Sequence, residues 1–249
     1  MDGWCALREE GARWRDQGRA PELWWRDDDA QRPTPALERL LALSASHAVP
    51  LALAVIPMQA EADLIARLGA TVQVLQHGAD HRNRAAAGEK KTEFPVAEPV
   101  EAAFARLGAA RLRLGGLAGD RFVQVLAPPW NRLSEDLLPR LAALGYRGLS
   151  RYGARRAPVP GLREVNTHVD IVAWRKDRGF IGEEAALQAI VQQLAGRREG
   201  RLDASEPTGL LTHHAAHDAA AWRFVERLLE TTRDIAGLRW RSAQELFHA

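Results

Sequence analysis

Short apolar runs alternate with amphipathic segments along most of the chain. Residues 50–57 form an almost continuous apolar run, which is typical of a strand buried on both faces of a parallel sheet. Residues 34–48 instead place four leucines at helical spacing, with Thr34 as a possible N-cap and Pro35 in the first turn. This pair of patterns predicts a strand and a helix as the repeating unit.

The same alternation continues to residue 235. Strands are expected at 22–26, 50–57, 71–78, 122–129, 146–152, 163–174 and 209–214, and helices at 34–48, 59–70, 98–114, 134–145, 182–196 and 218–235. Repeated strand–helix units favour parallel strands joined by right-handed crossovers. We therefore predict an α/β fold in one barrel-like domain spanning 1–249, with its core at about 22–240. A doubly wound open sheet is the alternative.

One long segment, residues 79–95, is polar and has no period. It is expected to be a loop, and long loops inside compact domains are often functional. Its part from 82 to 95, with Lys90, Lys91 and Glu93, either closes over a site or is solvated, and solvation is the usual state of a charged loop.

Unusual polar and aromatic residues cluster just where predicted strands end. They are Asp27, Asp28 and Asp29 after the first strand, His77 and His81 after the third, Pro128, Pro129, Trp130 and Asn131 after the fourth, Asp170 and Trp174 near the sixth, and His213 and His214 at the last. Parallel α/β folds build their sites at the carboxyl edge of the sheet from several loops. The sequence therefore predicts one site at this edge.

The spacing of His77 and His81 suggests a metal site. Residues four apart present both imidazoles to one side if a helical turn follows the strand. Two imidazoles and one carboxylate leave coordination positions open, which suits Zn²⁺ or another divalent first-row metal. The alternative is a pair of surface or capping histidines. His213 and His217 are also four apart, but His217 precedes a helix and is interpreted as structural.

Composition narrows the class of protein. The 249 residues are 46% hydrophobic and 27% charged, with a net charge of +2, as is ordinary for globular proteins. No basic run is interleaved with aromatics, so a nucleic-acid partner has little support. No nucleotide-binding glycine motif, signal-peptide pattern or membrane-spanning apolar run is present, and the single Cys5 allows no internal disulfide. We expect a cytoplasmic protein without membrane or nucleic-acid partners.

Taken in order, the strand-end residues resemble the five motifs of the polysaccharide deacetylases, also called NodB-homology or carbohydrate esterase family 4 proteins. The matching residues are Asp28-Asp29-Ala30, His77 and His81, Pro129 and Trp130, Asp170 and Trp174, and Leu211 and His213. The resemblance spans about residues 24–214. It implies a distorted (β/α)7 barrel that removes an acyl group, expected to be N-acetyl, from a glycan or a small sugar-like substrate.

The resemblance also implies roles. Asp28 would be the general base, His213 the general acid and Asp170 its orienting carboxylate. The implied metal ligands are Asp29, His77 and His81, and the implied substrate-binding residues are Pro129, Trp130, Asn131 and Trp174. Zinc is the first expectation for the metal, with Co, Ni, Fe or Mn as alternatives. A backbone N–H near residues 128–131 could hold the oxyanion.

Two departures from the family pattern stand out. The arginine expected before Pro-Pro-Trp is absent, since Ala127 or one of its neighbours occupies its place, and Arg26 or Arg132 could substitute for it. The family's second aspartate in the fourth motif is Ala173. Such departures leave two rival interpretations open: a hydrolase of another small amide or imide, and a non-catalytic glycan-binding protein.

The Asp27–Asp29 run raises a geometric question. Side chains on a strand alternate, so Asp28 and Asp29 can serve together only if the chain bends, which is expected at Ala30. Asp27 is then left over, either exposed or paired with an arginine. His214 is a secondary candidate for the acid, and the neighbouring Trp24 and Trp25 are expected in the core.

Overall fold

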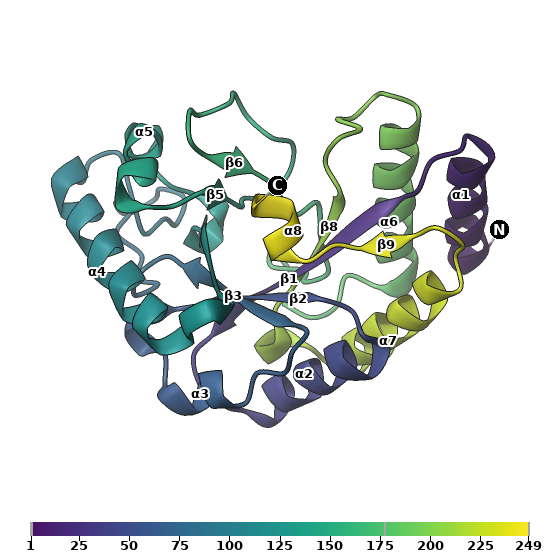
Figure 1. The fold of residues 1–249 in the computed structure, drawn as a ribbon, viewed down its shortest axis with the longest axis horizontal. Helices are drawn as coiled ribbons and strands as arrows, with labels where there is room; N and C mark the ends of the chain where they lie inside the picture. Colours follow the sequence, from purple (N-terminus) through teal and green to yellow (C-terminus); the bar gives the residue numbers. More distant parts are fainter. Residues whose placement is uncertain (1, 177, 249) are drawn as a thin grey trace.

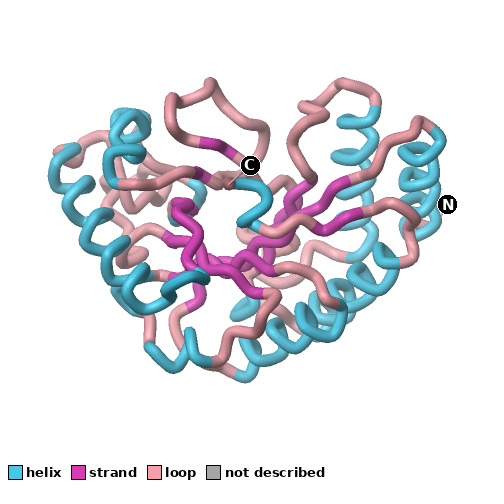
Figure 2. Tube along the Cα trace, viewed as in Figure 1, coloured by secondary structure: helices cyan, strands magenta, loops and turns pink. Residues whose placement is uncertain are grey.

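The computed structural model describes residues 2–176 and 178–248, and within them one curled sheet of parallel strands forms the centre of the molecule (Figures 1 and 2). The spatial order is β6-β5-β4-β3-β2-β1-β8-β7, and β9 also pairs with β1. The strands are β1 (Glu22–Ala30), β2 (Leu51–Val55), β3 (Val72–His77), β4 (Phe122–Ala127), β5 (Gly148–Leu149), β6 (Arg163–Glu164), β7 (Val169–Asp170), β8 (Thr208–Thr212) and β9 (Arg239–Trp240).

This strand order distinguishes a barrel from a doubly wound sheet. A doubly wound sheet reverses its order at a switch point near its middle. Here the order runs through β1 to β6 in sequence, and β8 and β7 continue on the other side of β1. The strands therefore follow one another around a curled sheet, and the barrel is left open between its two end strands, β6 and β7. The predicted distorted (β/α)7 barrel is confirmed.

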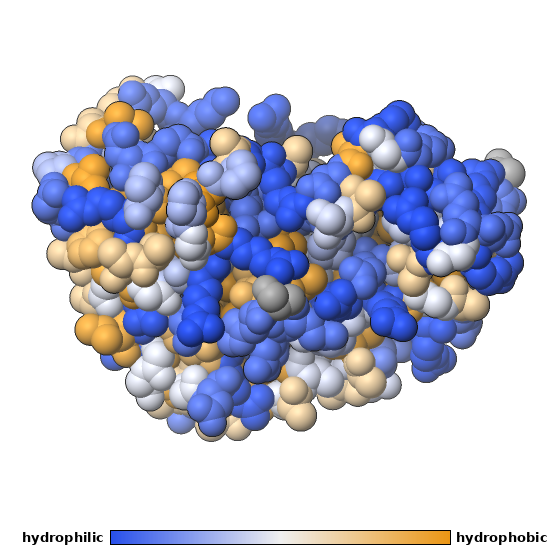
Figure 3. Space-filling model, turned by 45° about the horizontal axis from the view of Figure 1, so that its top comes forward, coloured by the Kyte–Doolittle hydropathy of each residue, from blue (hydrophilic) through white to orange (hydrophobic). Residues whose placement is uncertain are grey.

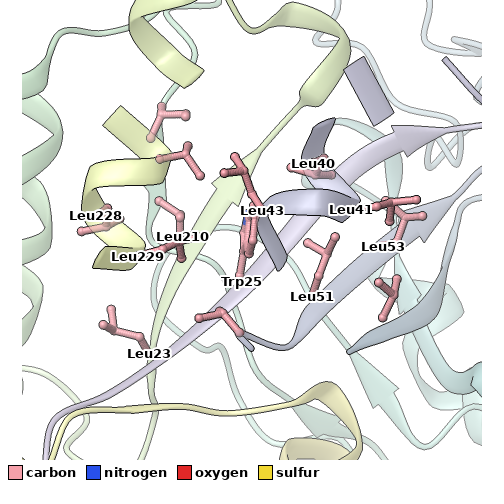
Figure 4. Close-up of a cluster of buried hydrophobic side chains, with 14 of the residues drawn as sticks. Leu23, Trp25, Leu40, Leu41, Leu43, Leu51, Leu53, Leu210, Leu228 and Leu229 are labelled. Atoms are coloured by element: carbon pink, nitrogen blue, oxygen red, sulfur yellow. The ribbon is translucent and has the colours of Figure 1, made fainter. Parts of the chain in front are cut away.

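Helices surround this sheet (Figure 1). They are α1 (Gly3–Asp16), α2 (Pro35–His47), α3 (Ala62–Ala66), α4 (Val100–Ala118), α5 (Leu138–Leu141), α6 (Glu183–Arg198), α7 (Ala219–Arg233) and α8 (Ala243–Phe247). Between the sheet and α2 and α7 lies the largest hydrophobic cluster, in which Trp25 packs with Leu40 and Leu228 (Figure 4). Fully burying one such leucine contributes about 2 kcal/mol, so this layer holds the helices on the sheet.

A second, smaller cluster fills the barrel interior. Trp24, Leu75 and Ala127 lie in it together with Leu246 and Phe247 of α8. The rings of Trp24 and Phe247 meet edge to face at 6.3 Å between centroids. In Figure 1, α8 lies in front of the central strands. The interior is therefore apolar on the side that α8 covers, and the polar residues gather toward the carboxyl ends of the strands.

Several predicted boundaries were wrong. Strand β1 continues to Ala30 instead of ending at residue 26. The helix expected at 59–70 is reduced to Ala62–Ala66, and a 3-10 turn at Pro57–Gln59 precedes it. The helix expected at 134–145 is broken into short pieces, with α5 carrying Pro139 in its first turn, where its missing N–H cannot continue a preceding helix.

Two more predictions need correction. The strand expected at 163–174 is split into the two-residue strands β6 and β7. The first helix, α1, was not predicted. It packs on α6, and the Trp4 indole N–H donates to Glu183 at the start of α6 at 2.8 Å.

The surface is largely hydrophilic on the face shown in Figure 3, and its hydrophobic side chains gather mainly toward the side that carries α4. Among the described helices, none has the length and apolar character needed to cross a bilayer.

Candidate metal centre and active site

Strand β1 sends its side chains alternately into the barrel and toward the helices. Trp24 belongs to the interior cluster and Trp25 to the cluster under the helices, and both are fully buried, which confirms the core assignment of this pair. By the same alternation Arg26 and Asp28 face the interior and Asp27 faces outward. One extended strand thus delivers alternate residues of the Arg-Asp-Asp-Asp run to two different environments.

Asp29 breaks this alternation. Its φ of 72° lies in the left-handed region, which aspartate enters more readily than most residues. The pairing register of β1 with β2 also shifts between Asp27 and Ala30. The carboxylate of Asp29 therefore turns toward His77 at the end of β3, on the same side of the strand as Asp28. The bend that the sequence requires is present, but it lies at Asp29 and not at Ala30.

Asp29, His77 and His81 form a group that could hold a metal ion. The Oδ1 atom of Asp29 lies 3.1 Å from Nε2 of His77 and 3.1 Å from Nε2 of His81. One potential ligand atom from each residue falls within 4.8 Å of the others. Asp29 Oδ1 is buried and accepts no hydrogen bond within the described chain. This orphaned oxygen, facing two imidazole nitrogens, fits the donor set of a divalent cation.

The protonation of these groups also suits a cation. Nδ1 of His77 lies 2.9 Å from the carbonyl oxygen of Ala127. A carbonyl oxygen only accepts, so Nδ1 carries a proton and Nε2 is the ring nitrogen that would bind a cation once deprotonated. Burial alone would raise the pKa of Asp29, but the imidazoles of His77 and His81 hold it far below its ordinary value. The carboxylate is therefore ionised, as metal binding requires.

His81 reaches the centre by a route that differs from the expected helical turn. The residues after β3 form no helix, and both Gly78 (φ 60°) and His81 (φ 58°) adopt left-handed backbone. The indole ring of Trp130 packs on the His81 imidazole with centroids 4.4 Å apart. The four-residue spacing therefore brings the two histidines together through a tight loop.

Asp28 is held by the arginine two residues before it. Arg26 Nη2 donates to Asp28 Oδ2 at 3.0 Å, and its Nε lies 2.8 Å from Asp28 Oδ1 as an ion-pair contact. The same guanidinium donates to the carbonyl and hydroxyl of Ser150 at 2.9 and 2.7 Å and to Asn131 Oδ1 at 2.7 Å. No part of Arg26 is exposed. Of the two candidates for the missing arginine, Arg26 contacts Asp28, whereas Arg132 donates to the Lys91 carbonyl.

His213 lies between two carboxylates. Its Nε2 is 4.0 Å from Asp28 Oδ2, and its Nδ1 is 3.9 Å from Asp170 Oδ1. The Asp170 carboxylate also accepts from the Trp174 indole N–H at 2.8 Å and the Val172 amide at 3.0 Å, and burial raises the pKa of Asp170. The Trp174 ring, 43% exposed, stands edge-on to His213 at 4.7 Å. Base, acid and orienting carboxylate candidates are thus neighbours.

Asp27 is neither exposed nor paired with an arginine, so both expectations for it were wrong. It is fully buried, and its Oδ1 lies 2.5 Å from His214 Nδ1. Oδ2 accepts from the His214 amide at 2.9 Å and the Thr212 hydroxyl at 2.6 Å. Burial opposes both charges, yet mutual attraction lowers the pKa of Asp27 and raises that of His214. This ion pair links β1 to the residues that follow β8. Because His214 is paired with Asp27, it is not the histidine that faces Asp28.

The charged residues of the loop between β3 and α4 suggested a solvated loop, but one of them is buried. Lys90 and Lys91 are exposed, but Glu93 is completely buried. Its carboxylate accepts backbone N–H groups from the segment that connects His77 to His81. Sequence reasoning missed Glu93 because its partners are main-chain groups, which no side-chain pattern reveals.

His217 lies outside the metal group and next to the helix it precedes. Its ring packs edge-on against Trp222 at 4.5 Å, and neither ring nitrogen has a hydrogen-bond partner within the described chain. Burial lowers the pKa of His217 to about 4. The structural interpretation of His217 stays a prediction, and its environment favours the neutral imidazole.

This environment predicts an acid sensitivity. The unfolded chain binds a proton at His217 below its ordinary pKa near 6.5, whereas the folded chain resists it down to about 4, so stability falls as pH drops through that window. His217→Gln should remove about 2 kcal/mol of this fall, after allowance for partial exposure. Urea unfolding at pH 7 and pH 4.5 measures it, with His248→Gln as the exposed control. An unchanged pH slope in His217→Gln would contradict the assignment.

Comparisons with known proteins bear on the fold. A Mycobacterium smegmatis protein assigned to the polysaccharide deacetylases aligns over 93% of this chain and 90% of its own, with 16% identity and a TM-score of 0.68. A Streptomyces lividans family 4 carbohydrate esterase, solved with acetate, aligns over 88% and 91%, with 16% identity and a TM-score of 0.58. A Clostridium thermocellum family 4 acetyl xylan esterase, solved with a cobalt ion, aligns over 91% and 90%, with 12% identity and a TM-score of 0.55.

No protein-family model matches the sequence, and no curated protein was found to match it. The structural likenesses extend over nearly the whole chain in each case. They show that this chain has the fold of the polysaccharide deacetylases and family 4 carbohydrate esterases, as the order of its short motifs predicts.

Proposed function

We propose that this protein is a metal-dependent hydrolase that removes an acyl group, first of all N-acetyl, from a carbohydrate. The observation that carries the proposal is the placement of Asp28 and His213, whose carboxylate and imidazole lie 4.0 Å apart beside the Asp29–His77–His81 group. The solved proteins that share the fold are named as deacetylases and carbohydrate esterases. A divalent ion held by this group would supply Lewis-acid chemistry, lowering the pKa of water and polarising a carbonyl.

The chain's own residues then divide the proton transfers. Asp28, held by the Arg26 guanidinium, takes a proton from the attacking water as general base. His213, whose Nε2 lies 4.0 Å from Asp28 Oδ2, gives a proton to the leaving amine nitrogen as general acid. Asp170 stabilises the protonated imidazole of His213 from 3.9 Å.

Two aromatic residues border this arrangement. Trp130 packs on His81 and Trp174 stands against His213, so the two indoles flank the metal group and the acid. We assign them to holding the sugar ring, together with Pro129 and Asn131, which lie in the same 3-10 turn as Trp130. A backbone N–H of that turn would hold the developing oxyanion.

The proposal predicts metal-dependent release of acetate. Protein stripped with a chelator should lose turnover of N-acetylated sugar oligomers and regain it when Zn²⁺ or Co²⁺ is added back. Acetate release is measured beside metal content, with O-acetylated sugars and small cyclic amides as parallel substrates. Turnover of the small amides alone would favour the other hydrolase, and tight glycan binding without any turnover in the metal-loaded protein would favour a binding protein.

A further inference from the structure

A buried carboxylate, that of Glu93, accepts hydrogen bonds from the loop that joins His77 to His81. Glu93 Oε1 accepts the N–H groups of Ala79 and Asp80, both at 3.0 Å. Its Oε2 accepts those of Ala79 at 3.2 Å and His81 at 3.3 Å. Three consecutive backbone amides therefore point at one side chain, which lies 12 to 14 residues later in the sequence.

The backbone leaves little room for another arrangement. Gly78 has a φ of 60°, and a Cβ placed there would lie 2.1 Å from Glu93 Oε2 and 2.6 Å from Cδ of Pro129. Glycine is thus needed where the chain leaves His77, because the carboxylate fills the space a side chain would take. The conformation from Gly78 to His81 is built around Glu93.

The nearby arginines are engaged elsewhere. Arg84 lies 3.9 Å and Arg106 3.8 Å from Glu93 Oε1. Arg84 makes its shorter contacts with Asp80, at 2.7 and 2.8 Å, and Arg106 with Glu98, at 2.6 and 2.8 Å. The backbone amides of residues 79–81 are therefore the main partners of Glu93, and these arginines add a favourable field at longer range.

We propose that Glu93 is a positioning residue that sets the His81 imidazole at the right distance from His77 and Asp29 for metal binding. The inference rests on the proposed metal centre and deepens it. Glu93 holds the N–H of His81 itself, and His81 is the one member of the group that lies outside a strand. Partners that orient metal ligands typically contribute 10- to 100-fold in metal affinity.

The test uses Co²⁺ alone and needs no substrate. Glu93→Gln keeps the shape of the side chain but replaces one acceptor oxygen with a donor, so it loses part of the amide contacts. We expect its Kd for Co²⁺ to rise by about tenfold, and the visible absorption of bound Co²⁺ to change because the His81 ligand moves. Glu89→Gln in the same loop, whose partner is the Ala86 amide at 3.3 Å, should keep the wild-type Kd and spectrum. Glu93→Asp, with two acceptor oxygens, should fall between them.

Wild-type Kd and spectrum in Glu93→Gln would overturn the proposal. Hydrogen exchange supplies a second readout that does not depend on metal. The amides of residues 79–81 should exchange slowly in the wild-type chain and faster in Glu93→Gln, while those of β2 stay unchanged. Equal exchange in both would also overturn it, and fast exchange of these amides in the wild type would do so even if the variant fails to fold. Failure of the wild type to bind Co²⁺ would contradict the proposed metal centre. Hydrogen exchange would then show separately whether Glu93 holds the backbone of residues 79–81.

Discussion

Asp28→Asn is expected to lower kcat for acetate release by about a thousandfold, within the range that a general base contributes, without lowering the metal content. Asparagine keeps the size of the side chain but cannot accept a proton from water near neutral pH. Asp28 is not part of the Asp29–His77–His81 group, so the ligand set stays complete. Acetate release and metal analysis on the same preparation measure both effects.

Two controls make the Asp28 result specific. Arg26 keeps Ser150 and Asn131 as acceptors in this variant, and thermal unfolding shows whether the loss of the ion pair weakens the fold. Asp63→Asn, at an exposed helical position, provides a matched aspartate change with full activity expected. Full activity in Asp28→Asn would place the base elsewhere, and loss of bound metal would show that Asp28 is itself a ligand.

The parts of the fold that could be predicted are those with strong periodicity. Strands β2 and β3, and helices α2 and α7, were expected within a few residues of where they lie, because a continuous apolar run or a stripe of apolar residues at helical spacing is the strongest local signal of secondary structure. The strands β5, β6 and β7 have only two residues each. Their lengths depend on how the sheet edges curl apart at the gap, which local sequence does not determine.

The site divides along a similar line. Its location was predictable because every candidate follows a strand, and parallel strands end at one edge. The pairing of Asp27 with His214 was not, because the two are 187 residues apart and share no local pattern. The left-handed turn at Asp29 was only implied: alternation required a bend, while its position depends on the register of β1 against β2. The side-chain partners of Arg26 could not be predicted either, because Ser150 after β5 and Asn131 after β4 meet Arg26 only through the curl of the sheet, in which β2 and β3 separate β1 from β4.

The arginine itself offers the sharpest stability test. Arg26→Ala should cost about 3–5 kcal/mol, because it leaves the buried Asp28 carboxylate without its counter-charge. Ala127 is fully buried in the interior cluster that contains Trp24, at the place where the resemblance expects the family's arginine. Ala127→Arg in the Arg26→Ala background would bring a guanidinium back to Asp28 from β4, into the volume that the first change empties. We expect the double variant to be more stable than the sum of the single changes by about 1–3 kcal/mol, a coupling typical of residues in contact.

A double-mutant cycle by urea unfolding measures this coupling. Acetate release by the double variant shows whether turnover is restored together with stability. Ala127→Arg alone should destabilise, since it adds a second arginine to a filled interior. Arg132→Ala is the matched control, because Arg132 donates to a loop carbonyl rather than to Asp28. Additive energies in the cycle, or equal losses for Arg132→Ala and Arg26→Ala, would argue against Arg26. If stability returned but turnover did not, the position of the arginine would matter. An arginine on β1, but not one on β4, would then orient the Asp28 carboxylate for catalysis.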